Sequence, residues 1–107
     1  MKKNDTIAII IARGGSKGIP RKNLVKLSGK PLISYAISKT LEAAKQWPME
    51  VLVSTDDEEI KSVAESYGAW CPFLRPPELA EDHVTSFPVV KHALSIAETI
   101  NKNKYEF

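Results

Sequence analysis

The chain has 107 residues, a net charge of +2, and 43% hydrophobic against 26% charged residues, which is typical of one globular domain rather than two domains or a disordered chain. No apolar run approaches the roughly 18 residues of a membrane span, and the apolar run Ile7–Ala12 is too short for a secretory signal. The single cysteine, Cys71, excludes an internal disulfide and a cysteine-based zinc site. We therefore expect one cytoplasmic domain, residues 1–107, with no membrane attachment.

The first elements are predicted to be a buried strand, a glycine-rich loop and an amphipathic helix. Ile7–Ala12 is a short, mostly β-branched run of the kind buried on both faces of a parallel sheet. Three glycines and a proline mark residues 13–20 as a loop, and residues 24–27 predict a brief extended segment. Pro31 suits a first helical turn, and apolar residues at helical spacing then predict a helix of about fourteen residues. These residues are Leu32, Ile33, Ala36, Ile37, Leu41 and Ala44.

A second strand and a second helix follow in the sequence. Residues 51–53 predict a buried strand, and either Asp56 or Asp57 is placed to cap the next helix, with two glutamates in its positive first turn. Gly68 is the expected residue just beyond the end of that helix. Residues 69–74 predict a third, weaker strand that Pro72 interrupts.

The last third of the chain predicts a loop, a helix and the start of another strand. Pro76 and Pro77 make residues 75–85 irregular, and Thr85 or Ser86 caps a helix that ends near residue 101. Residues 105–107 look like a strand beginning. The order predicts an α/β fold, a mostly parallel sheet with right-handed crossovers and helices on both faces. Because the chain stops on a strand, we expect a truncated domain or one completed by a second copy.

The charges are distributed unevenly along the chain. Residues 6–41 carry seven basic and no acidic residues, whereas residues 42–107 carry six basic and twelve acidic ones. A local positive field beside glycine-rich backbone suits a small polyanionic ligand, whereas nucleic acid would need a broader basic face. The alternative interpretation is a solvated, lysine-rich surface.

The loop after the first strand lies where open α/β sheets bind their ligands. Neither the Walker pattern nor the dinucleotide pattern fits it, because Gly18 is followed by Ile19 and the glycine spacing is wrong. Backbone N–H groups surrounded by cations are nevertheless what a triphosphate chain requires. The cations are Arg13, Lys17, Arg21 and Lys22.

Residues 12–23, with the sequence Ala-Arg-Gly-Gly-Ser-Lys-Gly-Ile-Pro-Arg-Lys-Asn, resemble the first motif of the cytidylyltransferases that activate nine-carbon sugar acids. This is the family of the CMP-N-acetylneuraminate (CMP-sialate) synthetases, or acylneuraminate cytidylyltransferases. Three later segments, residues 29–33, 53–60 and 75–82, resemble the family in the same order and spacing. The resemblance extends from about Ile7 to Ile100.

The resemblance implies a Rossmann-like nucleotidyltransferase fold and transfer of CMP from CTP to a nine-carbon sugar acid, a sialic acid or a bacterial relative, with release of pyrophosphate. Arg13 and Lys22 are the implied catalytic residues. Asn23 would contact the nucleoside, and Arg75 and Ser86 would help read cytosine and ribose. The full set implied to bind CTP is Ala12, Arg13, Gly14, Gly15, Ser16, Lys17, Lys22, Asn23, Arg75 and Ser86.

The same resemblance implies Mg²⁺ as cofactor and a homodimer as the assembly. Family members are considerably longer, and their metal-binding aspartates, part of the sugar pocket and most dimer contacts lie in the later half. The metal ligands are therefore expected outside residues 1–107, and the acidic residues 56–59 are interpreted as a helix cap. Two alternatives stay open: a non-catalytic CTP-binding fragment or module, and activation of another acidic sugar such as 3-deoxy-manno-octulosonate, whose enzymes usually carry a different first loop.

The remaining candidate reactive residues have structural interpretations. Cys71 is expected to be a small core residue on the third strand, and His83 to be exposed in the second loop. His92 is assigned to packing or to the surface of the last helix. Trp47 and Trp70 are expected to cover edges of the core.

Overall fold

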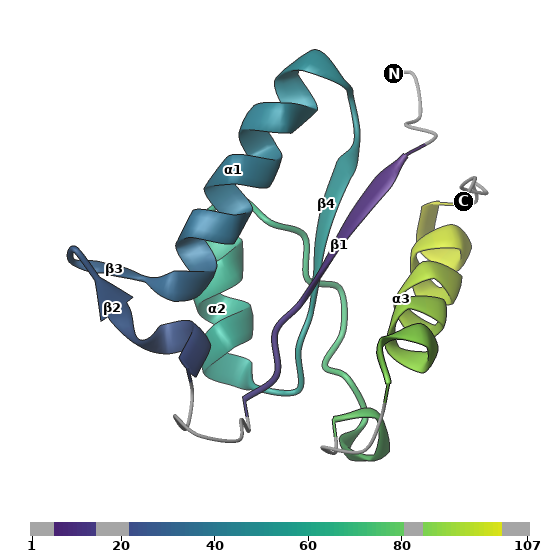
Figure 1. Cartoon of the computed structure of the whole chain (residues 1–107). Coiled ribbons are helices and arrows are strands. Elements are labelled where there is room, and N and C mark those ends of the chain that lie inside the picture. Colours follow the sequence, from purple (N-terminus) through teal and green to yellow (C-terminus); the bar gives the residue numbers. More distant parts are fainter. Residues whose placement is uncertain (1–5, 15–21, 81–84, 102–107) are drawn as a thin grey trace.

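Two parallel strands, β1 (Ile7–Ile11) and β4 (Glu50–Ser54), lie at the centre of the fold, with helices on either side (Figure 1). The computed structural model describes residues 6–14, 22–80 and 85–101. The predicted strand at residues 105–107 lies outside these ranges. The other elements are η1 (Lys22–Leu24), β2 (Lys26–Leu27), β3 (Lys30–Pro31), α1 (Leu32–Gln46), α2 (Glu58–Ser66), η2 (Pro77–Leu79) and α3 (Ser86–Asn101).

The parallel pairing of β1 with β4 runs in register from Ile7 opposite Glu50 to Ile11 opposite Ser54. The third strand predicted over residues 69–74 does not form as a strand. It is reduced to one parallel bridge between Trp70 and Leu52 on β4. Trp70 exchanges backbone hydrogen bonds with Val51 and Val53, but Pro72 has no N–H to continue the ladder.

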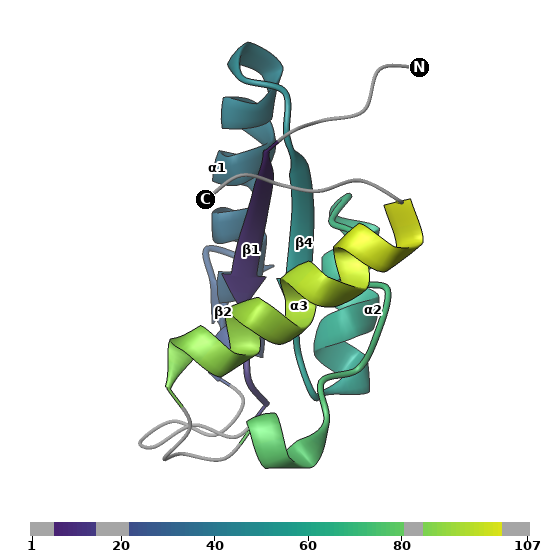
Figure 2. The same ribbon diagram turned by 90° about the vertical axis from the view of Figure 1, so that its right-hand side faces the viewer.

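The alternation of side chains along β4 divides the core between the two faces of the sheet. Val51 and Val53 point into the larger core under α1 and α2, whereas Leu52 points into a smaller core under α3. Figures 1 and 2 show α1 and α2 on one side of the strands and α3 crossing the other. The predicted α/β fold with helices on both faces of a parallel sheet is therefore confirmed.

The helix ends follow local chemistry that the sequence predicts. Asp57 caps α2, because its side chain accepts hydrogen bonds from the backbone N–H groups of Glu59 and Ile60. Gly68, just beyond the helix, has a φ of +96° that favours glycine. Pro31 precedes α1 as its N-cap, and α1 has 15 residues. None of the helices in the described ranges is long and apolar enough to cross a bilayer.

The short hairpin before α1 refines the extended segment expected at residues 24–27. Residues 22–24 form the 3₁₀ turn η1, and only Lys26 and Leu27 pair as strand β2 with β3. Ser28 and Gly29 both have positive φ, 53° and 82°, as a two-residue type I′ turn requires.

Four of the residues given structural interpretations have clear positions. Cys71 is a buried core residue and Trp70 packs against the core under α3, as expected. His92 packs edge-on against Phe73, with ring centroids 4.9 Å apart, which confirms the packing role. Trp47 was expected at a core edge, but its side chain is 66% exposed and its indole nitrogen donates to Thr6 Oγ1 on the surface.

Candidate functional site

The carboxyl ends of β1 and β4 lie side by side because the strands are parallel and in register (Figure 1). Ala12–Gly14 therefore leave the sheet beside residues 55–57. Ala12 N donates to Ser54 O at 3.0 Å, which continues the ladder by one step. The segment after residue 75 also returns to this edge, since Arg75 N donates to Thr55 O at 2.7 Å. Two loops that are far apart in the sequence thus meet at the end of β4.

Gly14 is held closely against the residues that follow β4. Its backbone N–H donates to Asp56 Oδ1 at 2.9 Å. A β-carbon at this position would lie 2.8 Å from Asp57 Oδ2 and 3.0 Å from Asp57 Cβ, which is closer than real side chains approach. The first loop therefore begins at a buried position where the backbone comes close to two carboxylates, and only glycine fits without a shift.

Arg13 connects the first loop with the second. The side chain is half-buried, and its Nη1 donates to Ala80 O at 3.4 Å. The carbonyl oxygen of Arg13 accepts from Asn23 Nδ2 at 3.3 Å. Arg13 and Asn23, both predicted to bind CTP, are thus in direct contact, although Asn23 uses its amide on the protein backbone in this structure.

Arg75 is buried, with 3% of its surface exposed, and lies across the end of β4. Its Nε donates to Ser54 Oγ at 3.1 Å, its Nη2 to Ser54 O at 2.6 Å and its Nη1 to Leu79 O at 3.3 Å. Burial lowers the pKa of Arg75 from its ordinary value, the Asp56 carboxylate opposes this shift, and Arg13 adds to it. The guanidinium is therefore a fixed cation between the two loops, with Asp56 as its nearby counter-charge.

The acidic residues after β4 have separate structural partners. Asp57 caps α2, whereas Asp56 accepts the hydrogen bond from Gly14. Within the part of the chain that the structure describes, no three His, Cys, Asp or Glu side chains are grouped so that they could hold a metal ion. The interpretation of residues 56–59 as a helix cap is correct for Asp57, and Asp56 has a different role.

The structure brings together one group of the predicted CTP-binding residues, and two others have exposed positions outside this group. Those gathered at the ends of β1 and β4 are Ala12, Arg13, Gly14, Asn23 and Arg75. Lys22 is exposed at the start of η1, and Ser86 is exposed at the start of α3. Gly15, Ser16 and Lys17 lie outside the described residues.

Sequence reasoning missed Ser54 and Asp56 as parts of this site. The positions of both residues follow from the strand register. Because Ile11 lies opposite Ser54, the residues that follow β1 lie beside the residues that follow β4. A predicted parallel pairing of residues 7–12 with residues 51–53 contains this signal. Without the exact register, however, neither the Gly14–Asp56 contact nor the Ser54–Arg75 contact can be specified.

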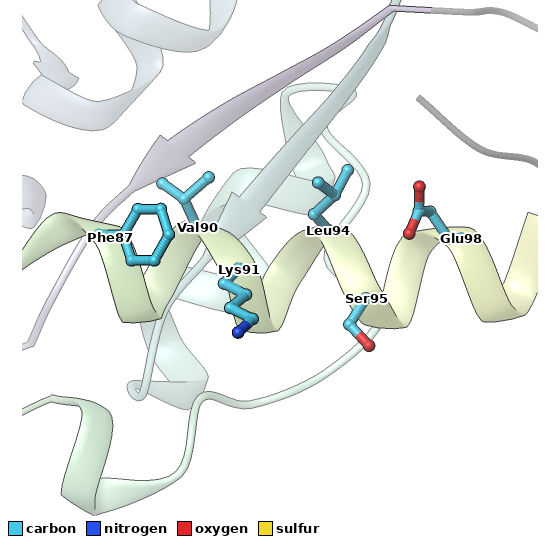
Figure 3. A pocket seen from close by; sticks show the side chains of 6 residues that line it. All are labelled: Phe87, Val90, Lys91, Leu94, Ser95 and Glu98. Atoms are coloured by element: carbon cyan, nitrogen blue, oxygen red, sulfur yellow. The ribbon is translucent and has the colours of Figure 1, made fainter. Parts of the chain in front are cut away.

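An open groove of about 370 Å³ lies elsewhere, along α3 (Figure 3). It is lined by Phe87, Val90, Lys91, Leu94, Ser95 and Glu98. These side chains all come from one helix, and none belongs to the set predicted to bind CTP. The groove is therefore a feature of the outer surface of α3 rather than part of the site at the ends of β1 and β4.

Comparison with known proteins places the chain in a family. The family model described as "Cytidylyltransferase" matches residues 7–104. The chain is 48% identical over 96 residues to the pseudaminic acid cytidylyltransferase of Campylobacter jejuni serotype O:2, covering 90% of this chain and 40% of that protein. It is 53% identical over 92 residues to the N-acylneuraminate cytidylyltransferase of Escherichia coli O18:K1:H7, covering 84% of this chain and 21% of that protein.

A solved structure supports the same assignment. The structure of CMP:2-keto-3-deoxy-manno-octonic acid synthetase complexed with CTP is similar to this chain with a TM-score of 0.73 and 25% sequence identity. The match covers 87% of this chain and 36% of that one. The chain thus spans 40% or less of the length of these relatives. The sequence motifs, the parallel sheet with its two loops and the match over residues 7–104 agree, and the chain belongs to the cytidylyltransferase family.

Proposed function

We propose that this chain is the nucleotide-binding part of an enzyme that transfers CMP from CTP to a nine-carbon sugar acid and releases pyrophosphate. The observation that carries the proposal is the meeting of Arg13, Gly14 and Arg75 at the carboxyl ends of β1 and β4, in a chain matched to the family over residues 7–104. Relatives named for pseudaminic acid, N-acylneuraminate and N,N'-diacetyllegionaminic acid support a sugar acid of this class.

The proposed reaction places a demand on the charge around the phosphates. The anomeric hydroxyl of the acceptor attacks the α-phosphorus, a new O–P bond forms, the bond to pyrophosphate breaks, and the hydroxyl proton is released to solvent. Negative charge must be stabilised on the phosphoryl oxygens and on the departing pyrophosphate, chiefly by positioning and electrostatics. We assign that role to Arg13, Lys17 and Lys22, together with the backbone of residues 14–16. Arg75 and Ser86 are assigned to the cytosine and ribose.

The cofactor, the assembly and the location belong to the same proposal. Mg²⁺ would be the cofactor, with its ligands outside residues 1–107, as the resemblance to the family implies. We propose a homodimer, which sedimentation of the protein would test. We also propose a cytoplasmic location for the protein.

Calorimetric titration of the 107-residue chain with CTP, ATP and GTP tests the nucleotide assignment. We expect CTP to bind in preference to the other two, because the second loop reads the base. Equal affinity for all three nucleotides would reject the cytidine assignment.

The variant Lys22→Ala tests the phosphate assignment within the same site. We expect it to weaken CTP by about tenfold or more, the scale of one charge-assisted contact, while cytidine binding changes little. Lys39→Ala, an exposed lysine on α1, is the matched control and should leave both ligands unaffected. Unchanged CTP affinity in Lys22→Ala would remove Lys22 from the phosphate site.

The likeness to CMP:2-keto-3-deoxy-manno-octonic acid synthetase favours activation of another acidic sugar as the second candidate. Pyrophosphate release measured with CTP, Mg²⁺ and each sugar acid in turn separates the two acceptors. The same assay addresses the non-catalytic alternative, because release by the 107-residue chain alone would eliminate it.

A further inference from the structure

Asp56 lies at the entrance of the glycine-rich loop, and its side chain contacts the opposite strand end rather than its own helix. At the start of α2, Asp57 Oδ1 accepts hydrogen bonds from the backbone N–H groups of Glu59, at 2.8 Å, and Ile60, at 3.1 Å. Asp56 Oδ1 instead accepts from Gly14 N at 2.9 Å, 42 residues away in the sequence. The capping of α2 therefore does not explain the presence of a carboxylate at residue 56.

Gly14 is fixed from two sides by this arrangement. Its N–H points to Asp56, and Asp57 occupies the space where a β-carbon would lie, with Oδ2 2.8 Å from that position. Glycine has more backbone freedom than any other residue, so such fixed contacts decide the direction in which the chain leaves β1. Contacts that fix the backbone of Gly14 before a ligand binds reduce the conformational entropy that this residue loses on binding.

The charge of Asp56 would oppose an anionic ligand if it were not balanced. Arg75 is buried and close enough for the two charges to interact, and Arg13 is also near Arg75. A buried cation in turn requires an anion or hydrogen-bond acceptors in its surroundings. Asp56 is thus the hydrogen-bond acceptor of the Gly14 amide, and the positive charges of Arg75 and Arg13 nearby offset its own charge.

We propose that Asp56 is a positioning residue, which holds the amide of Gly14 and so fixes the direction in which the chain leaves β1 toward the phosphates of CTP. This inference rests on the function proposed above, because it assigns Asp56 to that same site. Asp56 acts through Gly14 and does not itself touch the nucleotide.

The test compares Asp56→Ala with Asp56→Asn in the 107-residue chain, because an asparagine side chain keeps an oxygen that accepts from Gly14 N. Glu58→Gln, an exposed carboxylate in the first turn of α2, is the matched control for loss of charge. Hydrogen exchange of the Gly14 amide is followed by NMR without ligand, and CTP and cytidine affinities are measured by calorimetry. Far-UV circular dichroism confirms that each variant is folded, and Asp56→Ser replaces Asp56→Ala if the latter does not fold.

In Asp56→Ala we expect faster exchange at Gly14 and a loss of about tenfold in CTP affinity, equivalent to about 1.4 kcal/mol, with cytidine changed less than about twofold. Asp56→Asn should restore most of the protection and most of the CTP affinity, and Glu58→Gln should behave as the unmodified chain. A structural defect alone would weaken both ligands and would not be rescued by asparagine.

Three results would overturn the inference: unchanged Gly14 exchange or unchanged CTP affinity in Asp56→Ala, equal weakening of CTP and cytidine, or no rescue by Asp56→Asn. Failure of the unmodified chain to bind CTP is a separate outcome, which rejects the proposed function. In that case the exchange of Gly14 in the two Asp56 variants still decides whether the carboxylate holds the loop.

Discussion

Arg75 shows how one side chain can be hydrogen-bonded within the protein and also lie at the candidate site. Three of its side-chain nitrogens donate to oxygen atoms of Ser54 and Leu79. A guanidinium carries five N–H donors in a rigid plane, so a residue held in this way still presents charge in a fixed direction. The role predicted for Arg75 in reading cytosine and ribose stays a prediction, and the structure shows how firmly the residue is oriented.

Cys71 provides a prediction at the same scale. Burial raises the pKa of the thiol from about 9 to about 11, with a smaller opposing effect of Lys61. As the pH rises from about 9 to about 11, the unfolded chain loses this proton before the folded chain does. The free energy of unfolding should therefore fall by about 2 kcal/mol through this window, in addition to the effects of other groups.

Urea unfolding of the unmodified chain and of Cys71→Ala measures this contribution at about pH 8 and about pH 10.5. All other titrating groups are common to the two proteins, so the difference between their losses isolates the thiol. Parallel losses in both proteins would show that the thiol is not protected by burial.

At the scale of elements, the start of α2 depends on a single cap. Asp57 Oδ1 accepts from two backbone N–H groups that have no partner within the helix. Asp57→Ala should lower the free energy of unfolding by about 0.5–2 kcal/mol, measured by urea unfolding. Asp57→Asn keeps both the accepting oxygen and the packing against Gly14, and should recover most of the loss. An alanine variant as stable as the unmodified chain would contradict this role of the cap.

The helices and strands were predictable where local chemistry and tertiary packing favour the same structure. The apolar spacing of residues 32–44, the aspartates before α2 and Gly68 after it define two helices closely. Residues 69–74 have the composition of a strand, yet only Trp70 pairs with β4. Pro72 ends the backbone pairing, and the chain then turns so that Arg75 contacts Ser54, a tertiary contact that the composition of the segment does not specify.

The candidate site was predictable in part for a similar reason. Arg13, Gly14, Asn23 and Arg75 belong to recognisable motifs, and the structure brings them to one edge of the sheet. The contact between Gly14 and Asp56 depends on strand register, and the three bonds of Arg75 depend on the path of the second loop. Neither is encoded in the spacing of residues within a single motif.

At the scale of the whole molecule, the two faces of the sheet carry cores of different size. The core under α1 and α2 contains the buried residues Ala12, Ile33, Ile37, Val51, Val53, Ile60, Ala64, Ala69 and Cys71. The core under α3 contains Leu52, Ala93 and Ala97, of which two are alanines. Because buried apolar area supplies most of the stabilisation, α3 is held less firmly than α1.

We therefore expect the amides of α3 to exchange with solvent by local opening, faster than those in the middle of α1. Native-state hydrogen exchange at low urea concentration measures the opening free energies of the two helices. Leu52→Ala should lower the free energy of unfolding by about 2–5 kcal/mol and speed exchange in α3 further. Equal protection of α1 and α3 in the unmodified chain would contradict the difference between the two cores.

The carbonyl oxygen of Ser54 joins the starts of the two loops, in addition to the direct hydrogen bond from Arg13 to Ala80. It accepts from Ala12 N at 3.0 Å and from Arg75 Nη2 at 2.6 Å, so both of its lone pairs are occupied. A displacement of the second loop thus acts on the same peptide group to which Ala12, at the start of the first loop, is hydrogen-bonded. Contact of a base with one loop and of phosphates with the other would be thermodynamically linked through this oxygen atom, without any wider rearrangement of the sheet.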